Sequence, residues 1–269
     1  MIEYQYKGKV LTIAGSDSGG GAGIQADIKT ISALGCYAAS CITSVTAQNT
    51  TQVYSVYNIP QHIIQQQIEA VLSDINIDTI KIGMLPSYEA IKAVALSLPD
   101  IPIVVDPVMV SASNFRLMDN NAISDFIEHI IPKATIITPN IPEAEALAQI
   151  DIKDQNDMIK ASQIIKSLGT KYVLIKGGHM NQEIINNILL TEKDQILNFQ
   201  HKRTFNDELH GTGCTLSSAI ASFMSQKISI QESVNLGIQY ILNTIKTVPQ
   251  IGKGNNPVFH NYNIINTDP

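Results

Sequence analysis

Short runs of aliphatic and β-branched residues alternate with segments of helical periodicity along most of the chain. The runs predict strands at Val10–Ala14, Ser40–Thr46, Thr79–Ile82, Ile103–Asp106, Thr135–Thr138 and Tyr172–Lys176. The segments between them predict helices at Ala22–Leu34, Gln61–Leu72, Tyr88–Ser97, Asn120–Ile130, Glu143–Gln149 and Gln155–Leu168. Such a regular alternation of strand and helix is typical of an α/β protein with a mostly parallel sheet.

Two features extend this pattern to the whole chain. Apolar runs such as Ile103–Val105 predict strands buried between two layers of helices. Residues Ile184–Phe199 break the alternation with two strand-like runs, which predict a hairpin, and helices are expected from near Gly213 and over Ile230–Thr247. Because no linker, repeat or low-complexity tract is visible, we expect one doubly wound domain over residues 1–269.

Composition narrows the class of protein. The chain has 269 residues, of which 44% are hydrophobic and 16% charged, and its net charge is −6 without a long basic run. Neither a nucleic-acid nor an anionic-membrane partner is expected. The three cysteines form no CxxC pair, and the longest uncharged stretch is rich in polar residues. Residues Met1–Val10 have no apolar segment behind basic residues, so a signal peptide is not expected. These observations predict a soluble, cytoplasmic protein.

Residues that could bind a ligand or take part in catalysis cluster at the carboxyl ends of the predicted strands. Open α/β sheets bind ligands at this edge. These ends carry the segments Gly15–Gly23, Thr46–Thr50, Gly83–Met84, Asp106–Met109, Pro139–Glu143 and Lys176–His179. We therefore expect a small-molecule site along this edge.

The segment His210–Thr215, of sequence HGTGCT, precedes an amphipathic helix. Its glycines allow backbone N–H groups to converge at a helix N-terminus, where a phosphoryl group would be stabilised. Cys214 falls in the first turn, where the acidity of a thiol is raised, and could help remove a proton from an acceptor hydroxyl. A simple glycine turn with a buried structural cysteine is the alternative.

The loop Gly15–Gly23 contains a formal match to the dinucleotide fingerprint GxGxxA. The acidic residue expected about 20 positions later is missing, and no GK[ST] follows, so a nicotinamide-dependent oxidoreductase and a Walker P-loop are both disfavoured. The glycines could instead bring the backbone close to a small polar ligand, with Asp27 one turn inside the helix. A tight turn with an exposed Asp27 is the alternative.

Three further groups have both a functional and a structural interpretation. Asn140 and Glu143 fit a capping box, but Glu143 could also serve a phosphate-bound Mg²⁺. Asp106 ends a buried strand and requires a partner or a metal. Lys176, before two glycines, suits phosphate binding, although it could extend into solvent.

Together these segments resemble the hydroxymethylpyrimidine/phosphomethylpyrimidine kinases of thiamine biosynthesis, in the ribokinase-like superfamily. The resemblance runs from about Val10 to Val258 and is carried by the segments Leu11–Asp27, Ser44–Thr50, Lys81–Leu85, Asp106–Met109, Thr138–Ala144, Lys176–His179 and His210–Thr215. It implies a three-layer sandwich with helices on both faces of the sheet, a homodimer, and sequential transfer of two ATP γ-phosphoryl groups.

The resemblance also implies roles for individual residues. The pyrimidine would lie near Gly15, Asp27, Gln48, Met84 and Val108. Cys214 would be catalytic, with the amides of Gly211, Thr212 and Gly213 forming an anion hole. Lys176 and Asn140 would serve ATP and its phosphates, and Asp106 and Glu143 would organise Mg²⁺.

A departure at the family's flap, among several, and two alternatives accompany this assignment. Residues Ser111–Asn114 lack the lysine and glycine of the family's flap. The sequence therefore does not predict whether this segment closes over the substrate. A pyridoxal or pyridoxine kinase is the alternative enzyme, since its substrate is also a planar heterocycle with a hydroxymethyl group. A non-catalytic pyrimidine-binding protein is the alternative from another class.

Overall fold

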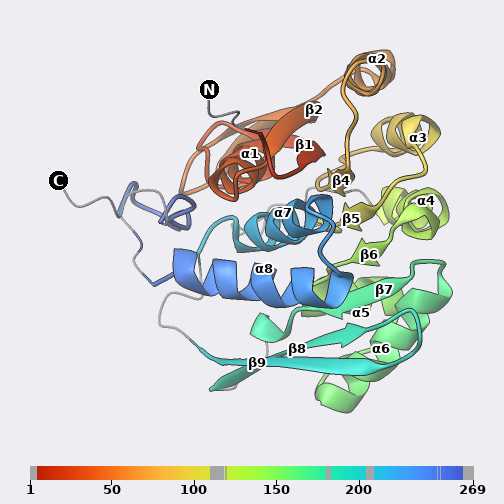
Figure 1. Ribbon diagram of the computed structural model, residues 1–269, viewed down its shortest axis with the longest axis vertical. Helices are drawn as coiled ribbons and strands as arrows, with labels where there is room; N and C mark the ends of the chain where they lie inside the picture. Colours follow the sequence, from red (N-terminus) through yellow and green to blue (C-terminus); the bar gives the residue numbers. More distant parts are fainter. Residues whose placement is uncertain are drawn as a thin grey trace.

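A nine-stranded mixed sheet forms the centre of the computed structural model, which describes residues 5–109, 118, 120–179, 183–203, 209–246, 248 and 250–262 (Figure 1). In spatial order its strands are β3 (Val53–Asn58), β2 (Tyr37–Gln48), β1 (Lys9–Asp17), β4 (Thr79–Ile82), β5 (Ile103–Val105), β6 (Ile136–Ile137), β7 (Tyr172–Ile175), β8 (Ile184–Leu190) and β9 (Ile196–Lys202). Neighbouring strands from β2 to β7 are parallel, whereas β3, β8 and β9 are antiparallel to their neighbours. The predicted α/β class with a mostly parallel sheet is confirmed.

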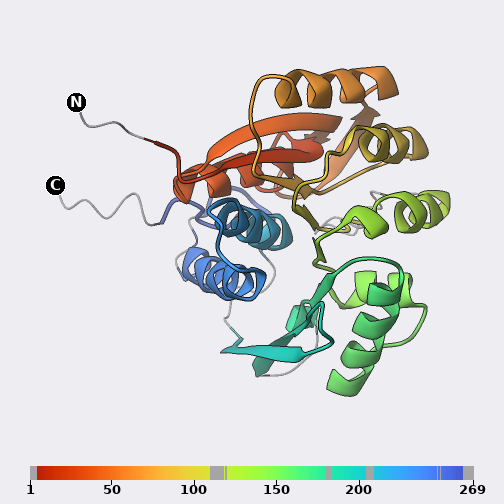
Figure 2. The same cartoon turned by 45° about the vertical axis from the view of Figure 1, so that its right-hand side comes forward.

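Helices cover both faces of the sheet (Figure 2). One hydrophobic core lies beneath α2 (Gln61–Leu72), α3 (Tyr88–Ser97), α4 (Asn120–His129), α5 (Ile141–Ala148) and α6 (Gln155–Ser167). The other lies beneath α1 (Gly23–Ala33), α7 (Thr212–Ser225) and α8 (Ile230–Thr244). The expected three-layer arrangement is therefore present.

The two cores follow from the alternation of side chains along the strands. On β1, Leu11 and Ile13 belong to the first core, and Val10 belongs to the second. Polar groups start several helices: Ser87, Asn140, Asp154 and Ser229 each accept a hydrogen bond from a backbone N–H three residues later. Core and helix ends are thus largely encoded by local sequence.

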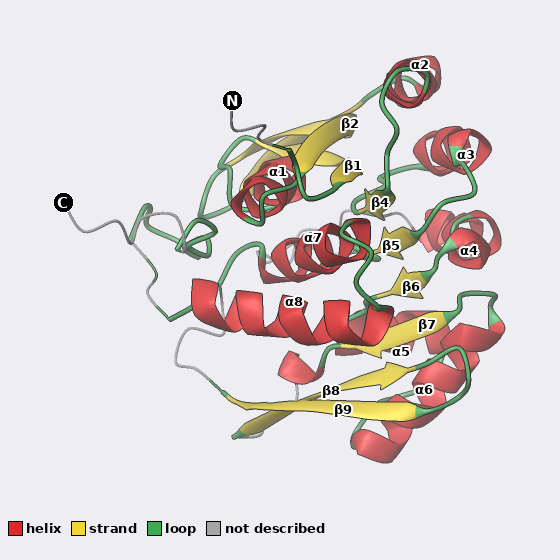
Figure 3. Ribbon diagram, viewed as in Figure 1, coloured by secondary structure: helices red, strands yellow, loops and turns green. Residues whose placement is uncertain are grey.

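The edges of the sheet differ most from the sequence prediction. Strand β3 was not predicted; it is an edge strand whose side chains are exposed except for Val53 and the half-buried Val56, so it lacks a clear apolar face. Strand β6 has only two residues, fewer than the predicted Thr135–Thr138. The predicted hairpin is confirmed as β8 and β9, which continue the sheet beyond β7 (Figure 3).

None of the helices within the described ranges is long and apolar enough to cross a membrane.

Candidate active site

The carboxyl ends of the parallel strands bring several predicted site residues together. Asp106 follows β5, Lys176 follows β7, and Lys176 Nζ lies 2.9 Å from Asp106 Oδ1. The hydroxyls of Thr138 and Ser217 each lie 3.3 Å from an Asp106 oxygen. Asp106 is 2% exposed, so the carboxylate that required a partner has one in Lys176.

Electrostatics keep this pair charged. Burial opposes the ionisation of Asp106, but Lys176 and Lys81 hold its pKa below the usual value. Burial likewise acts against the charged form of Lys176, but Asp106 and Glu143 raise its pKa. The site thus holds a fixed ammonium group with 15% of its side chain accessible, as contact with a phosphate requires.

Glu143 and Asn140 form the capping box that the sequence predicted. Asn140 Oδ1 accepts a hydrogen bond from the Glu143 N–H at 2.9 Å, and Glu143 Oε2 accepts one from the Asn140 N–H at 2.8 Å. Burial raises the pKa of Glu143 to about 7; Asp106 adds to this effect, and Lys176 opposes it. Glu143 therefore both caps α5 and lies close enough to Asp106 and Lys176 to interact with their charges.

The N-terminus of α7 lies against the same pair. Gly211 is the N-cap residue and has a φ of 82°, and a methyl group on it would come within 1.9 Å of the Gly21 carbonyl oxygen. A methyl group on Gly213 would lie 3.3 Å from Lys176 Nζ and 3.4 Å from Asp106 Oδ2. The half-buried first turn, which includes Thr212, therefore places a helix N-terminus beside an ammonium group, an arrangement that suits an anion.

Cys214 lies in this first turn and is half-buried. Burial raises its pKa to about 11; Lys81 opposes this increase, whereas Asp27 and Asp106 add to it. The sequence-based expectation of an acidified thiol is therefore wrong for the ligand-free protein, because desolvation outweighs the favourable charge of Lys81.

Of the residues expected around the pyrimidine, Gly15 and Met84 are adjacent. A methyl group on Gly15 would lie 3.0 Å from Met84 Sδ, so a side chain there would push Met84 away. Gln48 is half-buried at the end of β2, and Val108 is half-buried after β5. Gln48 thus ends β2, Val108 follows β5, and Gly15 lies within the last three residues of β1.

Comparison with known proteins identifies the family of this chain. Residues 17–259 match the family model described as phosphomethylpyrimidine kinase. The chain is 41% identical to the hydroxymethylpyrimidine/phosphomethylpyrimidine kinase of Haemophilus influenzae over 94% of this chain and 96% of that protein. The chain belongs to the phosphomethylpyrimidine kinase family. It is therefore a kinase that uses ATP, and the oxidoreductase alternative is removed.

A further relative and two solved structures are similar to this kinase over most of its chain. It is 42% identical to the thiamine biosynthesis bifunctional protein ThiED of Geobacter sulfurreducens, over 94% of this chain but only 52% of that longer protein. A crystal structure of phosphomethylpyrimidine kinase from Clostridium difficile has a TM-score of 0.78 and 45% identity, covering 88% of this chain and 99% of that one. A pyridoxal kinase from Staphylococcus aureus in complex with ADP has a TM-score of 0.87 at 31% identity, covering 95% and 94%. Phosphomethylpyrimidine kinases and pyridoxal kinases thus share the ribokinase-like fold.

Asp27 of this kinase lies one turn inside α1, as the sequence predicted, but its side chain has no contact with solvent. It is fully buried beneath α7, where Lys81 Nζ lies 2.9 Å from both of its oxygens and Ser218 Oγ lies 2.7 Å from Oδ1. Thr12 Oγ1 donates a further hydrogen bond of 2.6 Å. A direct contact with substrate is therefore not supported, because no surface of Asp27 is accessible; the exposed-turn alternative is excluded too.

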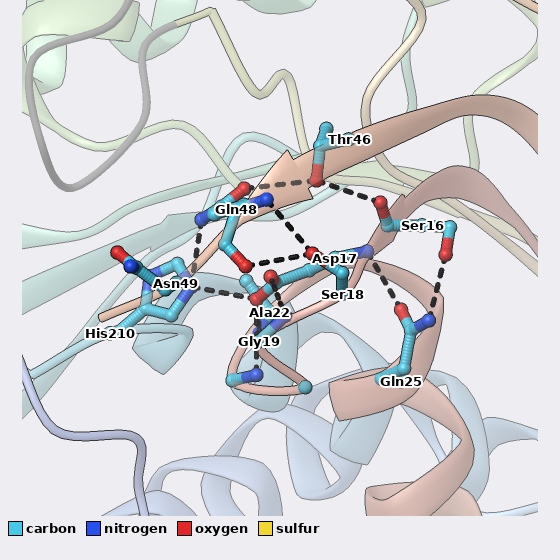
Figure 4. Close-up of polar contacts among 12 residues, drawn as sticks. Ser16, Asp17, Ser18, Gly19, Ala22, Gln25, Thr46, Gln48, Asn49 and His210 are labelled. Carbon is cyan, nitrogen blue, oxygen red and sulfur yellow. Dashed lines mark hydrogen bonds and ion pairs between the residues drawn. The ribbon is translucent and has the colours of Figure 1, made fainter. Parts of the chain in front are cut away.

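Sequence reasoning gave no site role to Asp17 or His210, which the structure brings together at the same edge of the sheet. The Asp17 carboxylate accepts hydrogen bonds from the N–H groups of Gly19, Gly21 and Ala22, and His210 Nε2 lies 2.8 Å from Asp17 Oδ2 (Figure 4). His210 Nε2 also lies 3.1 Å from the Gln48 amide. The only sequence signal was the position of both residues inside glycine-rich segments.

Metal binding has a limited basis in the described ranges. They contain no group of three or more histidine, cysteine or acidic side chains placed to hold a metal ion. Asp106 and Glu143 offer hard oxygen atoms, and a cation would offset the unfavourable burial that raises the pKa of Glu143. Such a pair fits Mg²⁺ that retains water and phosphate ligands. The altered flap, Ser111–Asn114, lies outside the described residues.

Proposed function

We propose that this kinase transfers the γ-phosphoryl group of ATP to the hydroxymethyl group of 4-amino-5-hydroxymethyl-2-methylpyrimidine, and then phosphorylates the resulting monophosphate. The supporting observation is the position of Gly213, at the N-terminus of α7, against the buried Asp106–Lys176 pair. The names of the relatives that match nearly the whole chain point to the same substrate.

The site residues divide the work of phosphoryl transfer among positioning and charge stabilisation. The amides of Gly211, Thr212 and Gly213 and the ammonium group of Lys176 stabilise the negative oxygens of the phosphoryl group. Cys214 lies beside the acceptor hydroxyl and orients it. Because burial keeps the Cys214 thiol protonated at neutral pH, most of the rate enhancement comes from charge stabilisation rather than from a strong base.

Mg²⁺ would be held through Asp106, Glu143 and water, and it would neutralise charge on the ATP phosphates. Asn140 keeps Glu143 in place through the capping box, next to the ATP phosphates. On the substrate side, Gly15, Met84, Val108 and Gln48 surround the pyrimidine, and Asp27 acts only indirectly, by fixing Lys81 beneath the site.

A second candidate is a pyridoxal kinase, favoured by the higher TM-score of the pyridoxal kinase structure, 0.87 against 0.78. Sequence identity favours the pyrimidine instead, at 45% against 31%. The two candidate substrates differ in the ring that carries the hydroxymethyl group, so the ring-binding end of the site would distinguish them.

The deciding experiment supplies ATP and Mg²⁺ with the hydroxymethylpyrimidine or with pyridoxal, and resolves the products by mass. We expect both the monophosphate and the diphosphate of the pyrimidine. Monophosphate alone would contradict the second transfer, and phosphorylated pyridoxal alone would establish the second candidate. Binding of the pyrimidine without turnover would instead indicate the non-catalytic protein.

We expect a single kinase domain that assembles as a homodimer in the cytoplasm. The three free cysteines suit a reducing compartment that supplies ATP. Exposed Tyr57 on the edge strand β3 pairs with exposed Val45 on β2, and this apolar surface could receive a second subunit.

A further inference from the structure

A chain of polar groups links the glycine-rich loop to the segment that begins α7 (Figure 4). It runs from the Ser16 carbonyl to Thr46 Oγ1 (2.9 Å), to the Gln48 amide (3.2 Å), to His210 Nε2 (3.1 Å) and to Asp17 Oδ2 (2.8 Å). Asp17 and His210 are both buried. Water therefore cannot freely substitute for these contacts, and each donor must meet an acceptor.

The two ends of this chain fix its direction. The Ser16 carbonyl only accepts, so the single proton of Thr46 Oγ1 points to it. Burial opposes ionisation of Asp17, but the hydrogen bonds from His210 and the Ala22 N–H lower its pKa, so it is an acceptor-only carboxylate. His210 Nε2 must then carry a proton, whichever state Nδ1 is in.

The amide of Gln48 lies between these two fixed partners. It must accept from His210 Nε2–H, which is shared with Asp17, and it must donate to Thr46 Oγ1. Its oxygen therefore faces His210 and its nitrogen faces Thr46. Figure 4 draws the amide the other way round, with its nitrogen toward His210. The two orientations have the same shape, but the drawn one would place an N–H group of Gln48 against the Nε2–H of His210.

The backbone of Gln48 is clamped as well. Its N–H donates to Ser18 Oγ at 2.8 Å, and Ser18 Oγ donates to its carbonyl oxygen at 2.7 Å. With backbone and amide both held, one N–H and one oxygen lone pair remain at the end of the side chain. Such an end pairs with a ring nitrogen that lies next to an exocyclic amino group.

We propose that His210, oriented by Asp17, is a positioning residue that fixes the Gln48 amide so that the site selects heterocycles with an acceptor nitrogen beside an amino group. The inference rests on the proposed function, in which Gln48 faces the substrate ring. It deepens that function by explaining how the site distinguishes the aminopyrimidine, which has this edge, from pyridoxal, which does not.

The kinetic test compares kcat/KM for the aminopyrimidine with that for its 4-oxo counterpart, in which the ring nitrogen is a donor and the substituent an acceptor. We expect the wild-type protein to prefer the amino compound by about 10³-fold or more. The 4-oxo compound would leave the N–H and oxygen of the Gln48 amide without hydrogen-bond partners. In His210→Ala the amide can turn over, and this preference should fall by about tenfold or more. His210→Gln, whose amide N–H can donate to Asp17, should restore most of it.

A purely structural role for His210 would lower kcat/KM equally for both compounds, and an unchanged preference in folded His210→Ala would overturn the proposal. His260→Gln is the matched control, because His260 is a buried histidine that contacts Thr215. Its preference should equal that of the wild-type protein, and a loss as large as that in His210→Ala would also count against the proposal.

A second measurement does not depend on turnover or on the folding of a variant. Neutron diffraction from ligand-free wild-type crystals exchanged into deuterium oxide should show a deuteron on His210 Nε2 and two on the Gln48 atom nearest Thr46. Two deuterons on the atom nearest His210 would overturn the proposal. If neither pyrimidine is phosphorylated, the proposed function fails while this result still decides how His210 holds Gln48.

Discussion

At the scale of single residues, Cys214 shows how two local effects compete. A helix N-terminus favours a thiolate, and Lys81 acts in the same direction. Burial, together with the carboxylates of Asp27 and Asp106, outweighs both and raises the pKa to about 11. A cysteine at the start of a helix is therefore reactive only if the surrounding charges and solvent permit it.

Alkylation measures this directly. We expect Cys214 of the ligand-free protein to react with iodoacetamide slowly at pH 7.5, with a rate that keeps rising through pH 10 because the thiolate fraction is still growing. Peptide mass spectrometry at a series of pH values follows the site. A rate that levels off below pH 9 would show that the thiol is not shielded.

Replacement of the same residue tests its share in catalysis. Cys214→Ala should lower kcat by about 100-fold, because the acceptor hydroxyl loses the group that orients it, while the Kd for the pyrimidine changes little. Steady-state kinetics and calorimetry give the two numbers. A kcat close to that of the wild-type protein would remove Cys214 from the mechanism.

His260 makes stability depend on pH. Burial lowers its pKa from 6.5 to about 4, with a smaller effect from Lys29, so the unfolded chain binds a proton more readily than the folded protein between these values. Stability from this residue is complete above pH 6.5 and is lost as pH falls toward 4, by up to about 3 kcal/mol. Urea unfolding of wild-type protein and His260→Gln should show a smaller loss in the variant; parallel curves would contradict it.

At the scale of elements, the N-terminus of α7 depends on two glycines for different reasons. Gly211 has a positive φ and touches Gly21, whereas Gly213 faces the Asp106–Lys176 pair. The first glycine thus lets the helix begin where it does, and the second leaves space for an anion.

Alanine substitutions should separate these roles. Gly211→Ala should destabilise the protein, by roughly 1–3 kcal/mol for the backbone conformation alone. Gly213→Ala should preserve stability but reduce turnover, since its methyl group would occupy the space beside Lys176. Gly178→Ala, which meets nothing within 4 Å, is the stability control. Full turnover in Gly213→Ala would contradict the assigned anion site.

The buried pair of Asp27 and Lys81 joins α1, β4 and α7. Lys81→Met leaves a buried carboxylate without its cation and should cost about 3–5 kcal/mol in the free energy of unfolding. Adding Asp27→Asn removes the charge and keeps an acceptor for Ser218, so the double variant should recover much of that loss. Denaturant unfolding of both variants tests the pair; equal losses would mean that charge is not the cause.

At the scale of the whole molecule, local patterns determine what the sequence could predict. Apolar runs and capping residues located the parallel strands and most helices because both signals lie within a few residues. Edge strand β3 escaped because it buries little. Contacts between distant residues had no local signal: Lys81 is 54 positions from Asp27, and His210 is 193 positions from Asp17. The burial of Asp27 and the fixing of Gln48 therefore required the structure.

We propose above all that this protein phosphorylates an aminopyrimidine in preference to pyridoxal. Competition between the two substrates tests this most directly. With ATP, Mg²⁺ and an equimolar mixture of the hydroxymethylpyrimidine and pyridoxal, the ratio of initial phosphorylation rates gives the ratio of kcat/KM values. We expect the pyrimidine to be preferred by about 100-fold or more, because only it can satisfy the oriented Gln48 amide. Equal rates, or a preference for pyridoxal, would contradict the account.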